Sequence, residues 1–228
     1  MSIGFIPTIS SLSKYVWEYY KRGLTVNVLY EGYTVAKTIY RAKEYFRPND
    51  RIVAKVYGAS RALLAFPEDD LIPKATETFP SGSFDTTKIK DHDDDTGVVT
   101  PTVSGPILKY DLGSPGYYLL IVRAEIPATV VLNVAVSEDG STWDIVFNWF
   151  VGSTETRFGS YFGYFRYVKF EQSDSVILYT VEVYPLQEVS TTEYTYDKLF
   201  DTEYYGTISL LTDGLNPVHA LLYKVRSL

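Results

Sequence analysis

The chain has 228 residues, of which 46% are hydrophobic, and a formal net charge of −7. That length allows one large or two small β domains with a buried core, so a disordered chain is not expected. The acidic balance argues against a nucleic-acid binder, and the absence of Cys removes disulfides, thiolate metal sites and a Cys nucleophile. The 21 Tyr favour strands and contact surfaces, and a Cys-free chain with one Met would also suit a thermophile.

The N-terminal segment predicts one helix, which begins at Ser10 or Ser11 and ends near Arg22, before Gly23. An apolar stripe at helical spacing supports it: Leu12, Tyr15, Val16, Tyr19 and Tyr20. The helix either packs on its own domain or docks a partner. Residues 1–7 lack the features of a secretory signal, and no apolar run has the length of a membrane span.

Three strand-like runs follow this helix. They cover Leu24 to Tyr30, Tyr33 to about Tyr45, and Arg51 to Tyr57. Glu31-Gly32 is expected to form a tight turn between the first two, and 47–50 a turn before the third. The apolar stretch from 57 to 66 is ambiguous, and 67–73 is predicted to be a loop.

The composition changes at Ala75. A stretch rich in Ser, Thr, Gly and Pro leads to an acidic cluster at 91–95 and then to short strands at regular spacing, which is typical of a β-sandwich. The predicted strands cover 107–110, 117–124, 128–136, 143–151, 165–170 and 176–184. Asp139-Gly140 indicates a hairpin. The Tyr-rich tail from 188 to 228 holds two further apolar runs around a turn at 213–217.

The order of several short motifs resembles a discoidin-type domain, the galactose-binding-like β-sandwich of coagulation-factor C domains and many carbohydrate-binding modules. The motifs that carry the resemblance are the lead 76–88, Asp91-His92-Asp93-Asp94-Asp95-Thr96, Asp111-Leu112-Gly113, the hairpin 136–143, the strand 165–170 and the strand 180–184. The family usually has Gly where this chain has His92, and Trp where it has Val98. The predicted domains are therefore 1–74 (helix and small β region), 75–187 (sandwich) and 188–228 (interface arm). The fold class is mainly β: a discoidin-like jelly-roll β-sandwich, an N-terminal helix with a β-hairpin region, and a Tyr-rich C-terminal extension.

The resemblance also implies a structural Ca²⁺ in the acidic loop. By motif position its ligands would be Asp91, Asp93, Thr96 and Glu182, which supply the oxygen atoms that Ca²⁺ prefers. The alternative is a solvated acidic turn. In the same family Arg166 would be structural, and we expect Trp143 in the core. Tyr117, Tyr118, Trp149, Tyr161 and Tyr164 are candidate rim aromatics, among which the sequence does not choose.

No catalytic signature is found, because neither His92 nor His219 lies in a zinc or triad motif, and we expect a protein that is not an enzyme. Two functions remain. The first is a structural or assembly protein of an extracellular particle, most plausibly a virion component, whose partners are its own copies or other virion proteins. The alternative is a carbohydrate-binding or adhesion module that recognises cell-surface glycans. Either function places the protein on a virion or an extracellular surface. If the terminal segments fold back onto the protein, a self-contained binding module is favoured.

Overall fold

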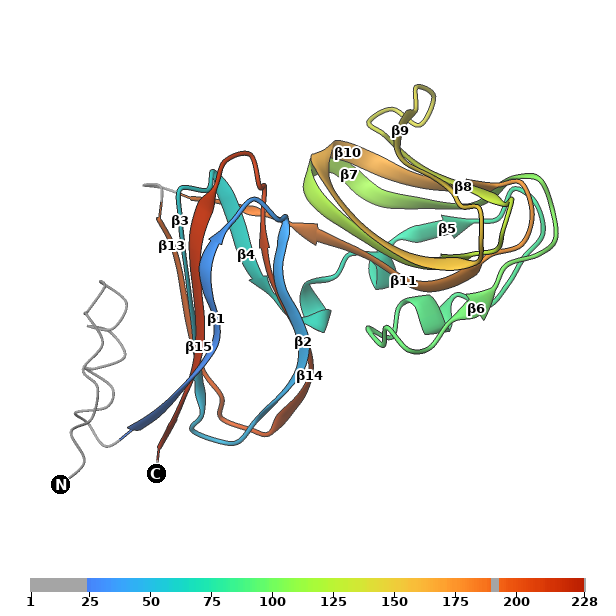
Figure 1. The fold of residues 1–228 in the computed structure, drawn as a ribbon. Helices are drawn as coiled ribbons and strands as arrows, with labels where there is room; N and C mark the ends of the chain where they lie inside the picture. The colour runs from blue at the N-terminus through green and yellow to red at the C-terminus, as the bar shows by residue number, and fades with distance from the viewer. Residues whose placement is uncertain (1–23, 190–192, 228) are drawn as a thin grey trace.

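The computed structural model describes residues 24–189 and 193–227, which form two β-rich lobes (Figure 1). The mainly β fold class is confirmed. The predicted helix from Ser10 or Ser11 to Arg22 lies outside the described residues. Within those residues the helical segments are three short 3₁₀ turns: Pro67–Asp69, Ile72–Lys74 and Thr87–Ile89. No helix in this part of the chain is long and apolar enough to cross a membrane.

One lobe is built from both ends of the described chain, and we call it the terminal sandwich. Its strands are β1 Leu24–Thr34, β2 Thr38–Phe46, β3 Arg51–Tyr57, β4 Arg61–Ala65, β12 Gln187–Glu188, β13 Glu193–Leu199, β14 Tyr204–Thr212 and β15 Val218–Ser227. They form two four-stranded sheets, in the orders β1-β15-β3-β13 and β12-β4-β14-β2. The C-terminal segment, expected to be an interface arm, thus supplies strands that pair with those of the N-terminal segment. Buried side chains such as Phe46, Ile52 and Leu222 pack together in this lobe.

Strand β1 is longer than the sequence predicts. Glu31 and Gly32, expected to form a turn, lie inside the strand and pair with Leu221 and Ala220 of β15. A register shift between Val28 and Tyr30 lets the pairing continue, so the chain turns only after Thr34. Tertiary pairing with a distant strand therefore overrides a local turn motif.

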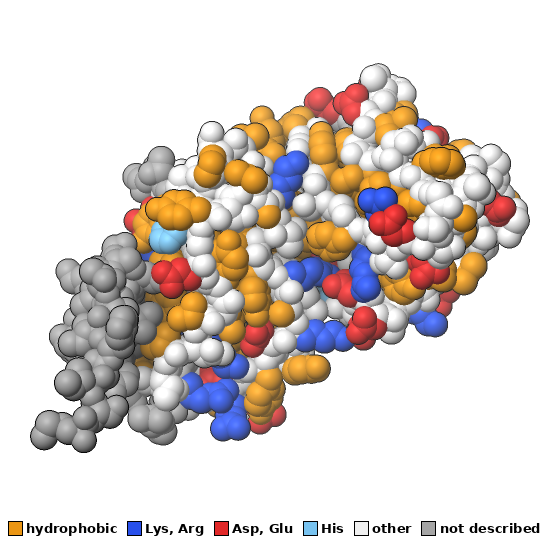
Figure 2. Space-filling view, viewed as in Figure 1, with side chains coloured by type: hydrophobic (Ala, Val, Ile, Leu, Met, Phe, Trp, Pro, Cys, Tyr) orange, Lys and Arg blue, Asp and Glu red, His pale blue; other side chains and the backbone are white. Residues whose placement is uncertain are grey.

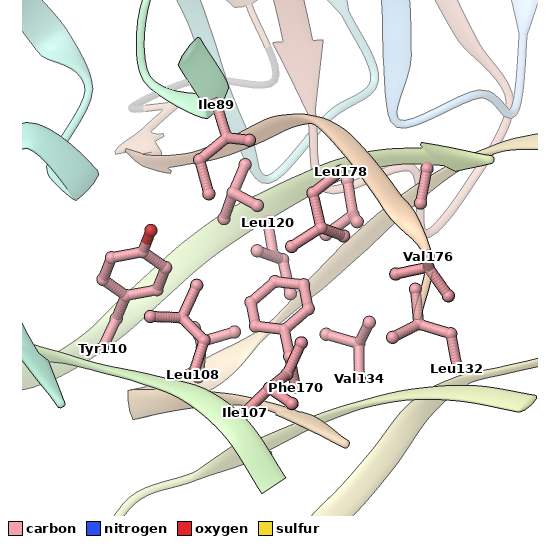
Figure 3. Close-up of a cluster of buried hydrophobic side chains, with 14 of the residues drawn as sticks. Ile89, Ile107, Leu108, Tyr110, Leu120, Leu132, Val134, Phe170, Val176 and Leu178 are labelled. Carbon is pink, nitrogen blue, oxygen red and sulfur yellow. The ribbon is translucent and has the colours of Figure 1, made fainter. Parts of the chain in front are cut away.

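The other lobe, the middle sandwich, matches the region of the discoidin-type resemblance. Its strands are β5 Thr76–Thr78, β6 Val98–Val99, β7 Gly105–Ile126, β8 Val131–Ser137, β9 Asp144–Phe150, β10 Glu155–Gln172 and β11 Ile177–Pro185. The order is β6-β11-β7-β10-β8-β9, with β5 also on β7. Figure 3 shows the core, in which side chains such as Leu120, Val134 and Phe170 converge from β7, β8 and β10.

Two long strands shape this lobe. β7 and β10 pair over most of their lengths, but the register shifts between Phe165 and Tyr167, opposite 112–115 of β7. At this bend the Arg166 guanidinium donates to both carboxylate oxygens of Asp111, at 2.8 and 2.9 Å. The structural role expected for Arg166 is thus observed. β8 pairs with β10 only from Tyr167 to Gln172, which leaves space beside the bend.

A third apolar cluster joins the two lobes. On β7, Leu120 and Val122 face the middle core, whereas Leu119 and Ile121 pack against Leu63 and its neighbours in the terminal sandwich. The cluster consists of Leu63, Ala65, Leu119, Ile121, Tyr184, Leu186 and Leu211. Strands buried on both faces are apolar at every position, which explains why the stretch around β4 is ambiguous in the sequence.

Candidate functional site

The acidic loop at 91–95 lies against the terminal sandwich, close to Glu182 of β11. Figure 2 shows basic and acidic side chains gathered where the two lobes meet. The centre of this group is Arg41 of β2. Its Nη1 and Nη2 each donate to one oxygen of Glu182 at 2.7 Å, while Nε and Nη2 donate to Asp94 at 3.0 Å. The cluster of Arg41, Asp94 and Glu182 is called the arginine junction below.

The arginine junction is a buried ion pair at its centre. The side chain of Glu182 is fully buried and that of Arg41 is 8% exposed. Burial alone would lower the pKa of Arg41, but its hydrogen bonds to Glu182 and Asp94 outweigh this effect and raise the pKa. Burial would likewise raise the pKa of Asp94, yet the Arg41 guanidinium lowers it. Arg41 and Asp94 are therefore both charged at neutral pH.

Three of the four predicted calcium ligands have local or cationic partners of their own. The Asp91 carboxylate accepts from the Asp93 amide at 2.9 Å and from the Thr96 hydroxyl at 2.7 Å. Asp93 forms an ion pair with Lys43 at 2.9 Å. The fourth, Glu182, is bound by Arg41, whose other carboxylate partner in the loop is Asp94.

These contacts do not fit a calcium site made of Asp91, Asp93, Thr96 and Glu182. Both oxygens of Glu182 already accept from a guanidinium, and one also accepts from the Tyr184 hydroxyl at 2.8 Å. No group of three or more His, Asp or Glu side chains in the described ranges is placed to hold a metal ion.

His92 is one departure from the family motif, and its backbone has the conformation that the usual Gly would adopt. It has φ +58°, in the left-handed region where Gly is favoured and where the family usually has Gly. Its ring nitrogen Nε2 lies 3.2 Å from the buried carboxylate of Asp70, which also accepts from the amides of Ile72 and Val183. The imidazole thus connects the acidic loop to β11, which compensates for the strained backbone.

A second acidic turn, between β8 and β9, borders a pocket of about 440 Å³. The pocket lies beside the bend of β7 and β10, where β8 no longer covers the edge of β10. It is lined by two tyrosines, three carboxylates, two hydroxyls and a guanidinium: Tyr161, Tyr164, Glu138, Asp139, Asp144, Ser137, Thr142 and Arg166, with Pro115 and Val136. We call it the hairpin pocket.

The rim of the hairpin pocket is held rigidly. The Asp139 carboxylate accepts from the amides of Ser141 and Thr142 at 2.8 Å, and these hydrogen bonds hold the pKa of Asp139 well below its usual range. The predicted Asp139-Gly140 turn is observed, with Gly140 at φ +77°. Glu138 and Asp144 flank it, and Tyr164, 47% exposed, lies on the opposite side on β10.

The other aromatic candidates have different roles. Tyr118 is buried in the middle core, and Tyr117 stands beside Tyr164 with 5.0 Å between ring centroids. Trp143, expected in the core, is instead half-buried between Lys169 and Lys109, with their Nζ atoms 4.4 and 5.3 Å from its ring. The reason is strand alternation: its neighbours Tyr167 and Lys169 point away from the core, toward which Val168 and Phe170 point.

Comparison with known proteins finds no matching family model and no matching curated protein. Solved structures do match. One is the module CpGH89CBM32-6 from Clostridium perfringens, with 14% identity over 51% of this chain and 98% of that chain, at a TM-score of 0.42. Another is chitosan-binding module 1 of a Paenibacillus chitosanase/glucanase, with 18% identity over 50% of this chain and 98% of that chain, at a TM-score of 0.38. A third is the module of AlyQ in complex with 4,5-unsaturated mannuronic acid, with 13% identity over 57% and 97% and a TM-score of 0.30.

These solved structures are carbohydrate-binding modules with the discoidin-like, galactose-binding-like sandwich, over about half of this chain. The resemblance that the motif order indicates for 75–187 is confirmed to that extent.

Proposed function

We propose that this protein is a non-enzymatic carbohydrate-binding protein and that the hairpin pocket is its sugar site. The observation that carries the proposal is the lining of the pocket, where Tyr161 and Tyr164 lie beside several hydrogen-bonding groups. A pyranose has an apolar C–H face and a rim of hydroxyls. It would stack on a tyrosine ring while its hydroxyls donate to Glu138 and Asp144. The volume of about 440 Å³ suits a small ligand.

The charge of the lining favours one class of sugar. Glu138, Asp139 and Asp144 are acidic, and the only basic group in the lining, Arg166, is already paired with Asp111. The local field therefore repels uronic acids and sialic acids. Neutral or amino sugars are the ligands that we expect.

Binding without hydrolysis agrees with the position of these carboxylates. Glu138, Asp139 and Asp144 all belong to one turn and its flank. Glycoside hydrolysis needs two carboxyl groups on opposite sides of the scissile bond. The wall that faces this turn supplies tyrosines and a paired arginine, which is an arrangement for holding a sugar.

The pairing of the terminal segments helps to choose between a binding module and a structural protein of an extracellular particle. Residues 24–65 and 187–227 fold together into one sandwich, and its apolar contacts with the middle sandwich lie within the chain. Terminal segments that fold back onto the protein in this way favour a self-contained binding module. Assembly into a virion stays a prediction from the sequence.

The proposal can be tested on an array of neutral, amino- and uronic-acid oligosaccharides, followed by calorimetric titration with the best ligand. We expect Tyr164→Ala to weaken binding about tenfold, because the stacking surface is lost. The matched control is Tyr205→Ala, an exposed tyrosine on β14 of the terminal sandwich, which should bind as the wild type does. Absence of any bound oligosaccharide, or equal loss in both variants, would overturn the proposal.

A further inference from the structure

The arginine junction holds together groups from three places in the chain. Arg41 comes from β2 of the terminal sandwich, Asp94 from the acidic loop and Glu182 from β11. The backbone carbonyl of Asp94 also accepts from the Arg123 guanidinium, and its side chain accepts from the Thr180 hydroxyl at 2.7 Å. The acidic loop is thus fastened to β7, β11 and the terminal sandwich at once.

Fastening a loop to several strands in this way is a role that a bound cation performs in many proteins. A divalent ion draws carboxylates from different elements into one place and neutralises them there. Here the same two requirements are met by a side chain. Arg41 donates to four carboxylate oxygens and also to the Ser209 hydroxyl at 3.2 Å, so every nitrogen of its guanidinium has an acceptor.

We infer that Arg41 takes the place of a structural divalent cation in this protein. The acidic loop is held without metal, by an arginine that comes from outside the discoidin-like region. Two consequences follow. The wild-type protein gains no stability from Ca²⁺ and loses none to a chelator. Removal of the guanidinium leaves Asp94 and buried Glu182 unneutralised, and this carboxylate pair then attracts Ca²⁺.

Arginine is the side chain that this geometry requires. A planar guanidinium can bind one carboxylate in a bidentate manner on each of two edges, whereas a Lys ammonium is a point charge that cannot do both. Arg41→Lys is therefore a graded variant. It keeps the positive charge but loses part of the hydrogen bonding, so its melting temperature should fall between those of the wild type and Arg41→Met.

The test is thermal melting of the full chain in excess EDTA and in millimolar Ca²⁺, together with calorimetric titration of Ca²⁺ alone. The wild type should melt at the same temperature in both buffers and bind no Ca²⁺. Arg41→Met should melt about 10 °C lower in EDTA, and Ca²⁺ should restore part of that loss. The matched control is Arg51→Met, which removes an exposed pair with Asp197 and should change little in either buffer.

Three results would overturn the inference. One is a wild-type protein that Ca²⁺ stabilises, since a cation would then act beside Arg41. Another is an Arg41→Met variant that is as stable as the wild type in EDTA. The third is a loss of stability in Arg41→Met that Ca²⁺ does not restore, because Arg41 would then be an ordinary buried ion pair. If Arg41→Met does not fold, two measurements remain: the wild type in both buffers, and the melting temperature of Arg41→Lys. A wild type that Ca²⁺ stabilises, or an Arg41→Lys variant as stable as the wild type, overturns the inference. None of these measurements involves a sugar.

Discussion

The middle sandwich has two acidic turns that look alike in sequence and have opposite surroundings in the structure. At 91–95, Asp93 and Asp94 meet Lys43 and Arg41 from the other lobe. In the turn between β8 and β9, Glu138 and Asp144 line a pocket beside tyrosines. The one guanidinium in that lining, from Arg166, is already paired with Asp111. The chemistry of an acidic turn is therefore set by the cation that the rest of the fold brings to it.

The largest effect should come from removing Arg41, the cation that neutralises the first turn. Arg41→Met leaves Glu182 buried without a counter-charge and should cost about 3–5 kcal/mol in the free energy of unfolding, measured in urea. The double variant Arg41→Met/Glu182→Gln also removes the unpaired buried carboxylate, and its amide oxygen still accepts from the Tyr184 hydroxyl. We expect it to be about 1–2 kcal/mol more stable than Arg41→Met alone.

The control for this pair is Arg157→Met, which removes an exposed ion pair with Glu155 on β10. It should cost less than about 1 kcal/mol. If the double variant is less stable than Arg41→Met, the penalty does not come from an unpaired buried charge and the contrast between the two turns fails.

The second turn depends on its backbone, and a smaller effect is expected there. Gly140 has φ +77°, and an added Cβ would lie 3.1 Å from the Tyr167 ring. Gly140→Ala should cost about 1–2 kcal/mol and weaken sugar binding, because the rim of the hairpin pocket shifts. Gly152→Ala is the matched control, since Gly152 is exposed and its added Cβ would meet nothing within 4 Å. Equal costs for the two variants would show that the Gly140 conformation is not required.

The smallest effect concerns pH at the first turn. Burial would lower the pKa of His92, but the hydrogen bond to Asp70 outweighs this and raises it. The stabilisation by protonated His92 is thus fully present below its ordinary pKa, near 6.5, and is lost as the pH rises through the raised value. His92→Gln should reduce the loss of stability between pH 6 and pH 8, as measured by urea unfolding. An unchanged pH dependence would assign that loss to other groups.

The sequence predicts the second turn better than the first. The Asp139-Gly140 turn follows from a local motif and is observed. A structural role for Arg166 follows from the resemblance, but its partner Asp111 is identified only by the structure. The partner of Glu182 is 141 positions away in a strand with no motif of its own, so no local pattern identifies Arg41. The tyrosines of the hairpin pocket were candidates, but only the bend of β7 and β10 selects Tyr161 and Tyr164 among them.

Burial on both faces also prevents β4 and β7 from being assigned to a sheet from the sequence alone. The apolar runs in β4 and β7 contain no alternation, because one face of each belongs to its own core and the other to the junction of the lobes. A strand of that kind cannot be assigned to a sheet from its own residues. The pairing of the two terminal segments was hidden for a related reason, since it joins strands from opposite ends of the chain.

That pairing has a mechanical consequence. β1 and β15 are antiparallel neighbours, and Leu24 lies opposite Ser227. A force that pulls the two ends of the described chain apart would load the ladder one rung at a time, as in opening a zipper, and not in shear. The terminal sandwich would yield first. The middle sandwich, with its pocket, would carry no tension until the outer lobe had opened.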